Sequence, residues 1–262
     1  MFKKLIPPII LEILKKPSKY GYFGNYKTWQ EALNNSIGYD STAILEKVKN
    51  SLIKVKNGEA VYERDSVLFN KIEYSWPVLA GLLWAASQSG NKLTVLDFGG
   101  SLGSSYFQNR NFLEHVNLKW YIVEQENFVS CGKKFFENEK LKFINNIDEA
   151  PDKNTSVFLA SSSLPYIENP YKLMEDVIKV GFPYIIIDRT PFLEDRERIT
   201  VQNVRPGIYE ASYPAWFLNE KKFLELFKER YEMLTEFETI RKNKIDLGDR
   251  MAYEKGFIFK IR

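Results

Sequence analysis

The chain has 262 residues, enough for one sizeable α/β domain and a small appendage, and a net charge of +3. Its 44% hydrophobic and 27% charged residues are ordinary for a soluble globular protein. The small charge, and the lack of a basic run with interleaved aromatic residues, argue against a nucleic-acid partner. The single cysteine, Cys131, excludes an intramolecular disulfide and favours a reducing, cytoplasmic compartment.

The N-terminal segment 1–16, MFKKLIPPIILEILKK, has lysines on both sides of an apolar stretch. That stretch contains two prolines, is interrupted by Glu12 and is too short to span a bilayer. We expect a helix packed on the main domain, and a peripheral contact with the inner membrane stays open as the alternative. Residues 1–74 together predict a helical N-terminal extension or lid, with a helix over 41–55 where apolar residues recur at helical spacing.

The main domain is expected to start at residue 75, and strands and helices are expected to alternate from Leu93 onward. A buried helix is expected over 75–90, with a proline in its first turn and a glycine just past its end. Apolar strands separated by helices predict a doubly wound, mostly parallel α/β sheet covered on both faces. The last two strands, over 231–240 and 255–262, are joined by one loop and predict an antiparallel pair. The whole reads as a seven-stranded, Rossmann-like sheet; its first five strands are expected at 93–99, 119–125, 141–148, 156–163 and 183–190.

The stretch VLDFGGSLGSS, 95–105, places glycines and serines directly after the first of these strands. In such sheets ligands bind at the carboxyl ends of the strands. Glu124 ends the next strand, 27 residues after Asp97, where an acidic residue commonly binds the ribose hydroxyls of a nucleoside. The glycine spacing matches neither the dinucleotide fingerprint nor a P-loop. It resembles the acid-and-glycine motif of class I S-adenosylmethionine-dependent methyltransferases.

A more specific resemblance runs from about residue 24 to residue 217. The segments GNYKTWQEAL, GEAVYERDSVLF, LDFGGSLGSSYFQ, WYIVEQENFV, IIIDRTPF and IYEASYPAWF resemble the LIC12133 type of bacterial methyltransferase, found in surface-polysaccharide gene clusters. The resemblance implies that residues 75–262 are a methyltransferase domain using S-adenosylmethionine and releasing S-adenosylhomocysteine. It also implies methylation of a sugar, or of a sugar-linked phosphorus decoration, in capsule or lipopolysaccharide biosynthesis. The lack of the Asn-Pro-Pro-aromatic motif of amino-methylating enzymes favours an oxygen acceptor, and thus O-methylation. A non-catalytic module of the assembly pathway and a nucleotide-dependent oxidoreductase remain the alternatives.

The expected site residues follow from these strand ends. We expect the cofactor to contact Asp97, Gly99, Gly100, Ser101, Gly103, Glu124, Gln125, Asn146, Ser161 and Ser162.

On the acceptor side, Asp188 is the expected base, Arg189 would orient an anionic acceptor, and Tyr213 would wall the pocket. A structural salt bridge between Asp188 and Arg189 is the alternative. The connection 191–217 is unusually long, which favours a functional role. No spacing of metal ligands occurs in the sequence, so no metal is expected. The partner is expected to be a small molecule or a glycan, and the oligomeric state stays open.

Overall fold

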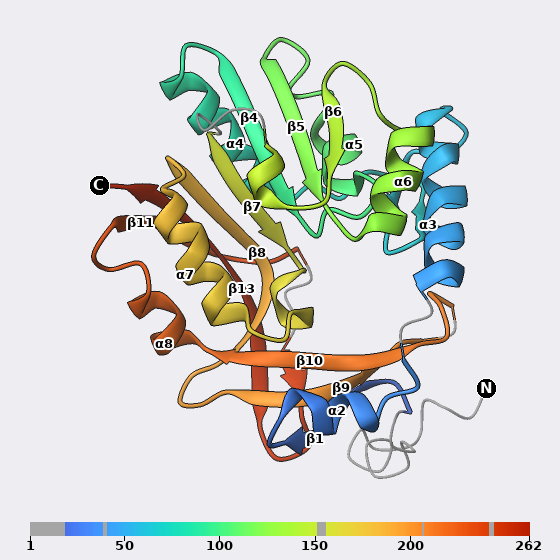
Figure 1. Cartoon of the computed structure of the whole chain (residues 1–262), viewed down its shortest axis with the longest axis vertical. Helices are drawn as coiled ribbons and strands as arrows, with labels where there is room; N and C mark the ends of the chain where they lie inside the picture. The colour runs from blue at the N-terminus through green and yellow to red at the C-terminus, as the bar shows by residue number, and fades with distance from the viewer. Residues whose placement is uncertain (1–18, 39–40, 151–155, 206, 241–243) are drawn as a thin grey trace, which may run out of the picture.

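The computed structural model describes residues 19–38, 41–150, 156–205, 207–240 and 244–262 (Figure 1). The expectation for residues 1–16 lies outside these residues. Five parallel strands form the centre of the sheet in the order β6–β5–β4–β7–β8. The doubly wound α/β fold expected from the sequence is confirmed. The strands are β4 (Lys92–Phe98), β5 (Asn117–Val123), β6 (Leu141–Ile144), β7 (Val157–Ser161) and β8 (Tyr184–Leu193).

The C-terminal strands add an antiparallel part to the sheet beside β8. β13 (Met251–Ile261) pairs antiparallel with β8, and β11 (Tyr231–Glu238) pairs antiparallel with β13. This confirms the antiparallel closing pair. A short strand, β12 (Lys244–Asp246), also pairs with β13.

Two hydrophobic cores lie on the two faces of the sheet. Side chains alternate across each strand, so Val95 of β4 points into one core and Leu96 into the other. Helices α3 (Ser41–Lys56), α4 (Trp76–Gln88), α5 (Ser104–Asn109) and α6 (Glu126–Phe135) cover the first face. Helices α7 (Pro170–Val180) and α8 (Glu220–Glu225) cover the second. Burial on both faces explains why these strands are almost continuously apolar.

The connection 191–217, which the sequence showed only as unusually long, contains two strands. β9 (Arg198–Asn203) pairs antiparallel with β10 (Ser212–Asn219), and β1 (Gly21–Tyr26) pairs with β9. Figure 1 shows these three strands crossing beyond the carboxyl ends of the parallel strands. In the described part of the chain, these strands and β12 extend the expected seven strands to a sheet of eleven. The sequence did not predict β9, because polar residues at both ends leave only the short β-branched run Ile-Thr-Val at its centre.

The expected helical extension also contains strands. Besides β1, it holds a hairpin of β2 (Tyr62–Arg64) and β3 (Val67–Phe69). The hairpin turn consists of Asp65 and Ser66, with φ values of 52° and 67°. The predicted helix over 41–55 is present as α3, and α2 (Trp29–Asn34) precedes it. No helix within the described residues is long and apolar enough to cross a membrane. Two short 3₁₀ turns follow β6 and β7, η1 (Ile147–Glu149) and η2 (Leu164–Tyr166).

Candidate functional site

The loop after β4 turns back on itself immediately beyond the strand. Gly99, Ser101 and Gly103 have φ values of 69°, 56° and 107°, a region in which L side chains are strained. The N–H of Gly99 donates to the carbonyl of Val123 at 2.9 Å, which ties the loop to the end of β5. The cluster of glycines in the sequence therefore corresponds to backbone conformations that the turn requires.

Gly100 is needed for a different reason, because its backbone lies directly against the carboxylate of Asp97. A Cβ at position 100 would be 2.6 Å from Cγ and from Oδ2 of Asp97. At Gly99 a Cβ would be 2.5 Å from the Cβ of Ser163, which follows β7. The two glycines let the loop lie against Asp97 of β4 and against Ser163 after β7, closer than a side chain would allow.

Asp97 is a buried carboxylate with 1% of its surface exposed. Its Oδ2 accepts a hydrogen bond from Nε1 of Trp120 at 3.0 Å, from the neighbouring strand β5. Burial raises the pKa of Asp97 to about 7, nearby Glu124 adds to the increase, and Trp120 and Arg189 oppose it. Sequence reasoning missed Trp120, although its register opposite Val95 puts its side chain on the same face as Asp97.

Glu124 connects the glycine loop to the start of α6. Its Oε1 accepts the N–H of Ser101 at 3.1 Å, and its Oε2 accepts the N–H of Gln125 at 3.0 Å. Burial raises the pKa of this half-buried carboxyl, and the two N–H groups partly offset the effect. An ionised carboxylate has about four acceptor positions, so these two bonds leave acceptor capacity for a ligand.

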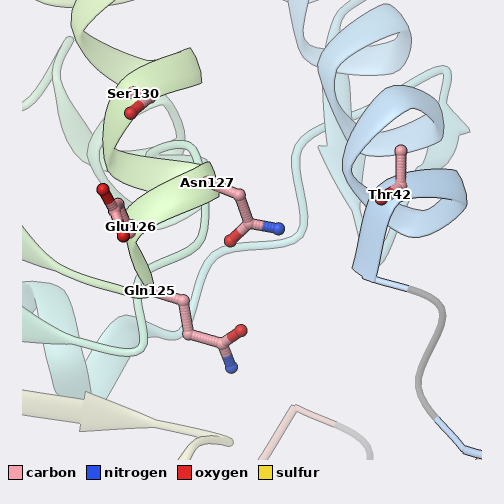
Figure 2. A pocket seen from close by; sticks show the side chains of 5 residues that line it. All are labelled: Thr42, Gln125, Glu126, Asn127 and Ser130. Carbon is pink, nitrogen blue, oxygen red and sulfur yellow. The ribbon is translucent and has the colours of Figure 1, made fainter.

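Gln125 is exposed and lines an open pocket between α6 and α3, together with Thr42, Glu126, Asn127 and Ser130. Figure 2 shows the side chains of Gln125 and Asn127 pointing into the space between the two helices. Asn146 follows β6 and caps η1, with its Oδ1 accepting from the N–H of Glu149 at 3.2 Å and its Nδ2 donating to the Glu149 carboxylate at 2.6 Å. These local bonds account for the placement of Asn146 without a ligand.

The end of β8 contains a β-bulge. Ile187 pairs with Phe257 and Thr190 with Lys255, so Asp188 and Arg189 both lie opposite the single residue Gly256. Arg189 has a φ of 50°. Bulges redirect side chains and are common beside active sites. The bulge explains how two successive residues can both contact the same group on β7.

That group is the hydroxyl of Ser161. Its Oγ donates to Oδ2 of Asp188 at 2.7 Å and accepts from Nε of Arg189 at 3.2 Å. Ser162 has a φ of 62° and donates its N–H to the carbonyl of Asp188 at 2.9 Å. Among the described residues, the buried Oγ of Ser163, Oδ1 of Asp188 and Nη1 of Arg189 have no hydrogen-bond partner. The sequence pointed to the two serines before Ser163, whereas Ser163 is the one with an unsatisfied hydroxyl beside the glycine loop.

The β2–β3 hairpin, part of the segment 1–74 that was expected as an extension or lid, contributes a buried acid. Glu63 is 1% exposed; its Oε1 accepts from the N–H of Ser66 at 2.6 Å and its Oε2 from Oγ of Ser104 at 2.7 Å. Burial raises the pKa of Glu63 to about 7, although both hydrogen bonds and the charge of Arg189 oppose the increase. Glu63 therefore fixes the hairpin to the start of α5, close to Arg189. In the sequence Glu63 is followed by Arg64 and Asp65, a charged run that does not reveal its burial.

Tyr213 of β10 belongs to an aromatic cluster opposite the end of β7. Its ring packs edge-on against Tyr166 at 5.2 Å, and its hydroxyl is 3.4 Å from that of Tyr209. Tyr166 donates its hydroxyl proton to Oε1 of Gln202 at 2.8 Å. Trp216 of the same strand stacks on Trp29 of α2. Of the described residues, no group of three or more His, Cys, Asp or Glu could hold a metal ion.

A scan against protein-family models finds no match to the chain, and a search of curated proteins finds none either. Among solved structures, the chain is similar to LepI in complex with SAM, with 10% identity, a TM-score of 0.46 and coverage of 70% of this chain and 46% of that chain. The aligned region is thus about half of the LepI chain.

Two further solved structures have comparable similarity. The 1,6-didemethyltoxoflavin-N1-methyltransferase of Burkholderia thailandensis, with bound S-adenosylhomocysteine, has 11% identity, a TM-score of 0.40 and coverage of 84% of this chain and 89% of that chain. The magnesium protoporphyrin IX methyltransferase of Synechocystis, with bound SAH, has 10% identity, a TM-score of 0.44 and coverage of 71% and 82%. At these values the likeness concerns the fold and carries nothing about the acceptor. The surface-polysaccharide family stays an expectation from the sequence.

Proposed function

We propose that the chain is an S-adenosylmethionine-dependent methyltransferase that methylates a hydroxyl oxygen of a small sugar or glycan. The observation that supports the cofactor is the carboxylate of Glu124, which lies beside the glycine loop of β4 and is bonded to its backbone. A carboxylate at the end of this strand, with acceptor capacity left, suits the two hydroxyls of a ribose. On this basis the adenine ring would lie toward the pocket of Gln125 and Asn127.

The residues around the loop fit this cofactor better than a dinucleotide. Asp97 and Glu124 place two carboxyl groups at the loop, and Glu124 already accepts the N–H of Ser101. These acids would repel the pyrophosphate of a dinucleotide, and the N–H of Ser101 would not be free to bind it. The sulfonium and α-amino groups of S-adenosylmethionine are cations, which the acids attract. The unsatisfied Oγ of Ser163, against Gly99, offers a further polar contact for the methionine part.

When bound, the cofactor supplies a methyl group already activated for in-line displacement by an oxygen nucleophile. The task of the protein is to hold the acceptor oxygen in line and to accept its proton. We assign proton acceptance to Oδ1 of Asp188, because Ser161 holds Oδ2 and leaves Oδ1 without a protein partner among the described residues. Tyr213 and Tyr166 would wall the acceptor, and the Glu63 hairpin would exclude water from one side.

Calorimetric titration with S-adenosylhomocysteine and with NAD tests the proposal. We expect micromolar-range binding of S-adenosylhomocysteine and no binding of NAD. The Glu124→Ala variant should bind S-adenosylhomocysteine more weakly, and Glu175→Ala, an exposed acid on α7, should bind it as the wild type does. Binding of NAD alone would contradict the methyltransferase proposal in favour of an oxidoreductase. Binding of neither would favour a module without cofactor chemistry.

A further inference from the structure

The pair of unsatisfied atoms at the bulge of β8 bears on the chemistry of the acceptor. Oδ1 of Asp188 and Nη1 of Arg189 are buried and lack a partner among the described residues. The two side chains are 4% and 13% exposed, and their bonded atoms, Oδ2 and Nε, are 3.6 Å apart. A buried charged group that lacks a hydrogen bond costs more free energy than a neutral group does. A ligand that forms hydrogen bonds with both atoms therefore gains binding free energy.

The two atoms demand opposite hydrogen-bond roles from a ligand. Oδ1 of a carboxylate only accepts, and Nη1 of a guanidinium only donates. A hydroxyl group, or two neighbouring hydroxyls, can donate to the first and accept from the second. A phosphate or carboxylate would satisfy Arg189 and meet the like charge of Asp188, and an ammonium group would have the reverse problem.

The charges around Arg189 also argue against an anionic ligand. Asp188 is its direct ion-pair partner, and Arg189 lies close enough to Glu63 and Asp97 to lower the pKa of each. The charge of Arg189 is therefore opposed by one carboxylate in direct contact and acts on two further carboxyl groups nearby. The net charge of this cluster is not positive, so it offers an anion no electrostatic gain.

We propose, resting on the proposed methyltransferase function, that the acceptor is an uncharged polyol such as a neutral sugar, whose hydroxyls bridge Oδ1 of Asp188 and Nη1 of Arg189. An anionic group is rejected at this position. This differs from the anionic acceptor that Arg189 suggested in the sequence, because the sequence shows the cation and not the acids folded around it.

The test follows the nitrogen NMR signal of Nε of Arg189, assigned by its loss in Arg189→Lys. Two neutral probes, methyl glucoside and glycerol, and one anionic probe, inorganic phosphate, are titrated with and without S-adenosylhomocysteine. In the wild type we expect a neutral probe to move the signal and phosphate to leave it unchanged. Asp188→Asn, which removes the repulsive charge at nearly constant shape, should bind phosphate at least about tenfold more tightly than the wild type does. Asp176→Asn is the matched control, because the side chain of Asp176 lies on the exposed side of α7.

The proposal would be overturned, in favour of an anionic acceptor, if phosphate moved the Arg189 signal of the wild type as strongly as it moves the Arg189 signal of Asp188→Asn. Failure of both neutral probes to move the wild-type signal would overturn it as well, because the paired atoms would then not be open to a polyol. Calorimetry with S-adenosylhomocysteine on the same samples reports separately on the proposed function. A wild type that responds to a neutral probe but does not bind S-adenosylhomocysteine would therefore contradict the methyltransferase assignment alone.

Discussion

Replacing Gly100 by alanine tests whether the glycine loop must lie against the carboxylate of Asp97. The added Cβ would be 2.6 Å from Cγ and Oδ2 of Asp97, which is closer than real Cβ contacts. Asp97 cannot easily move aside, since it is 1% exposed and bonded to Trp120 at 3.0 Å. Overpacking of this kind costs about 1–3 kcal/mol. For a domain of this size, that corresponds to a melting temperature lower by about 2–12 °C.

Thermal unfolding with and without S-adenosylhomocysteine is the assay for this variant. The loop must shift to admit the methyl group, so Gly100→Ala should lose both stability and ligand affinity. Gly207→Ala is the matched control, because its Cβ would meet no described atom within 4 Å and its φ is not positive. A Gly100→Ala protein that melts with the wild type and binds S-adenosylhomocysteine equally well would refute the close approach of loop and carboxylate.

The remaining predictions concern three acids and one tyrosine. Glu124→Ala should weaken S-adenosylhomocysteine binding by about 1.5–3 kcal/mol in calorimetry, through lost charge-assisted bonds to the ribose, and unchanged affinity would place the ribose elsewhere. Asp188→Asn should slow methyl transfer by about 100-fold or more while cofactor affinity stays within a few-fold, and full turnover would remove Asp188 as the base. Tyr213→Phe should also lose turnover without losing cofactor affinity, whereas a merely structural Tyr213 would show as lost thermal stability. Burial holds the pKa of Glu63 at about 7, above its ordinary 4.5, so the folded state keeps a proton that the unfolded state releases and stability falls as pH rises through this window. Glu63→Gln should therefore be more stable than the wild type above pH 7, by up to about 3 kcal/mol, and equally stable near pH 4; a difference that does not vary with pH in denaturation experiments would count against this assignment.

The sequence predicted the body of the fold because its strands are buried on both faces. Apolar runs such as VLDF in β4 and YIII in β8 have few other interpretations when helices separate them. Helix ends were less certain, because their limits depend on tertiary contacts. The helix after the glycine loop, for example, already ends at Asn109, and the residues after it continue only as turns.

The sequence predicted the candidate site only where a residue's position at the end of a strand decides which loop it lies beside. The ends of β4 and β5 put Asp97 and Glu124 near the same loop, as expected from a parallel sheet. Contacts made by distant segments were not predictable. Glu63 reaches the start of α5 through a hairpin turn, and the β8 bulge forms because Gly256, far along the chain, lies opposite two residues. A Cβ at Gly256 would be 2.8 Å from the carbonyl oxygen of Ile187, a requirement that only the folded pairing reveals.

A crystal structure of the chain with S-adenosylhomocysteine tests the central claim most directly. We predict that the ribose hydroxyls donate to the carboxylate of Glu124 and that the homocysteine part lies along the loop from Gly99 to Gly103, with its sulfur facing Asp188 and Arg189. S-adenosylhomocysteine bound away from the ends of β4 and β5, or bound there with its sulfur facing away from β8, would contradict the account.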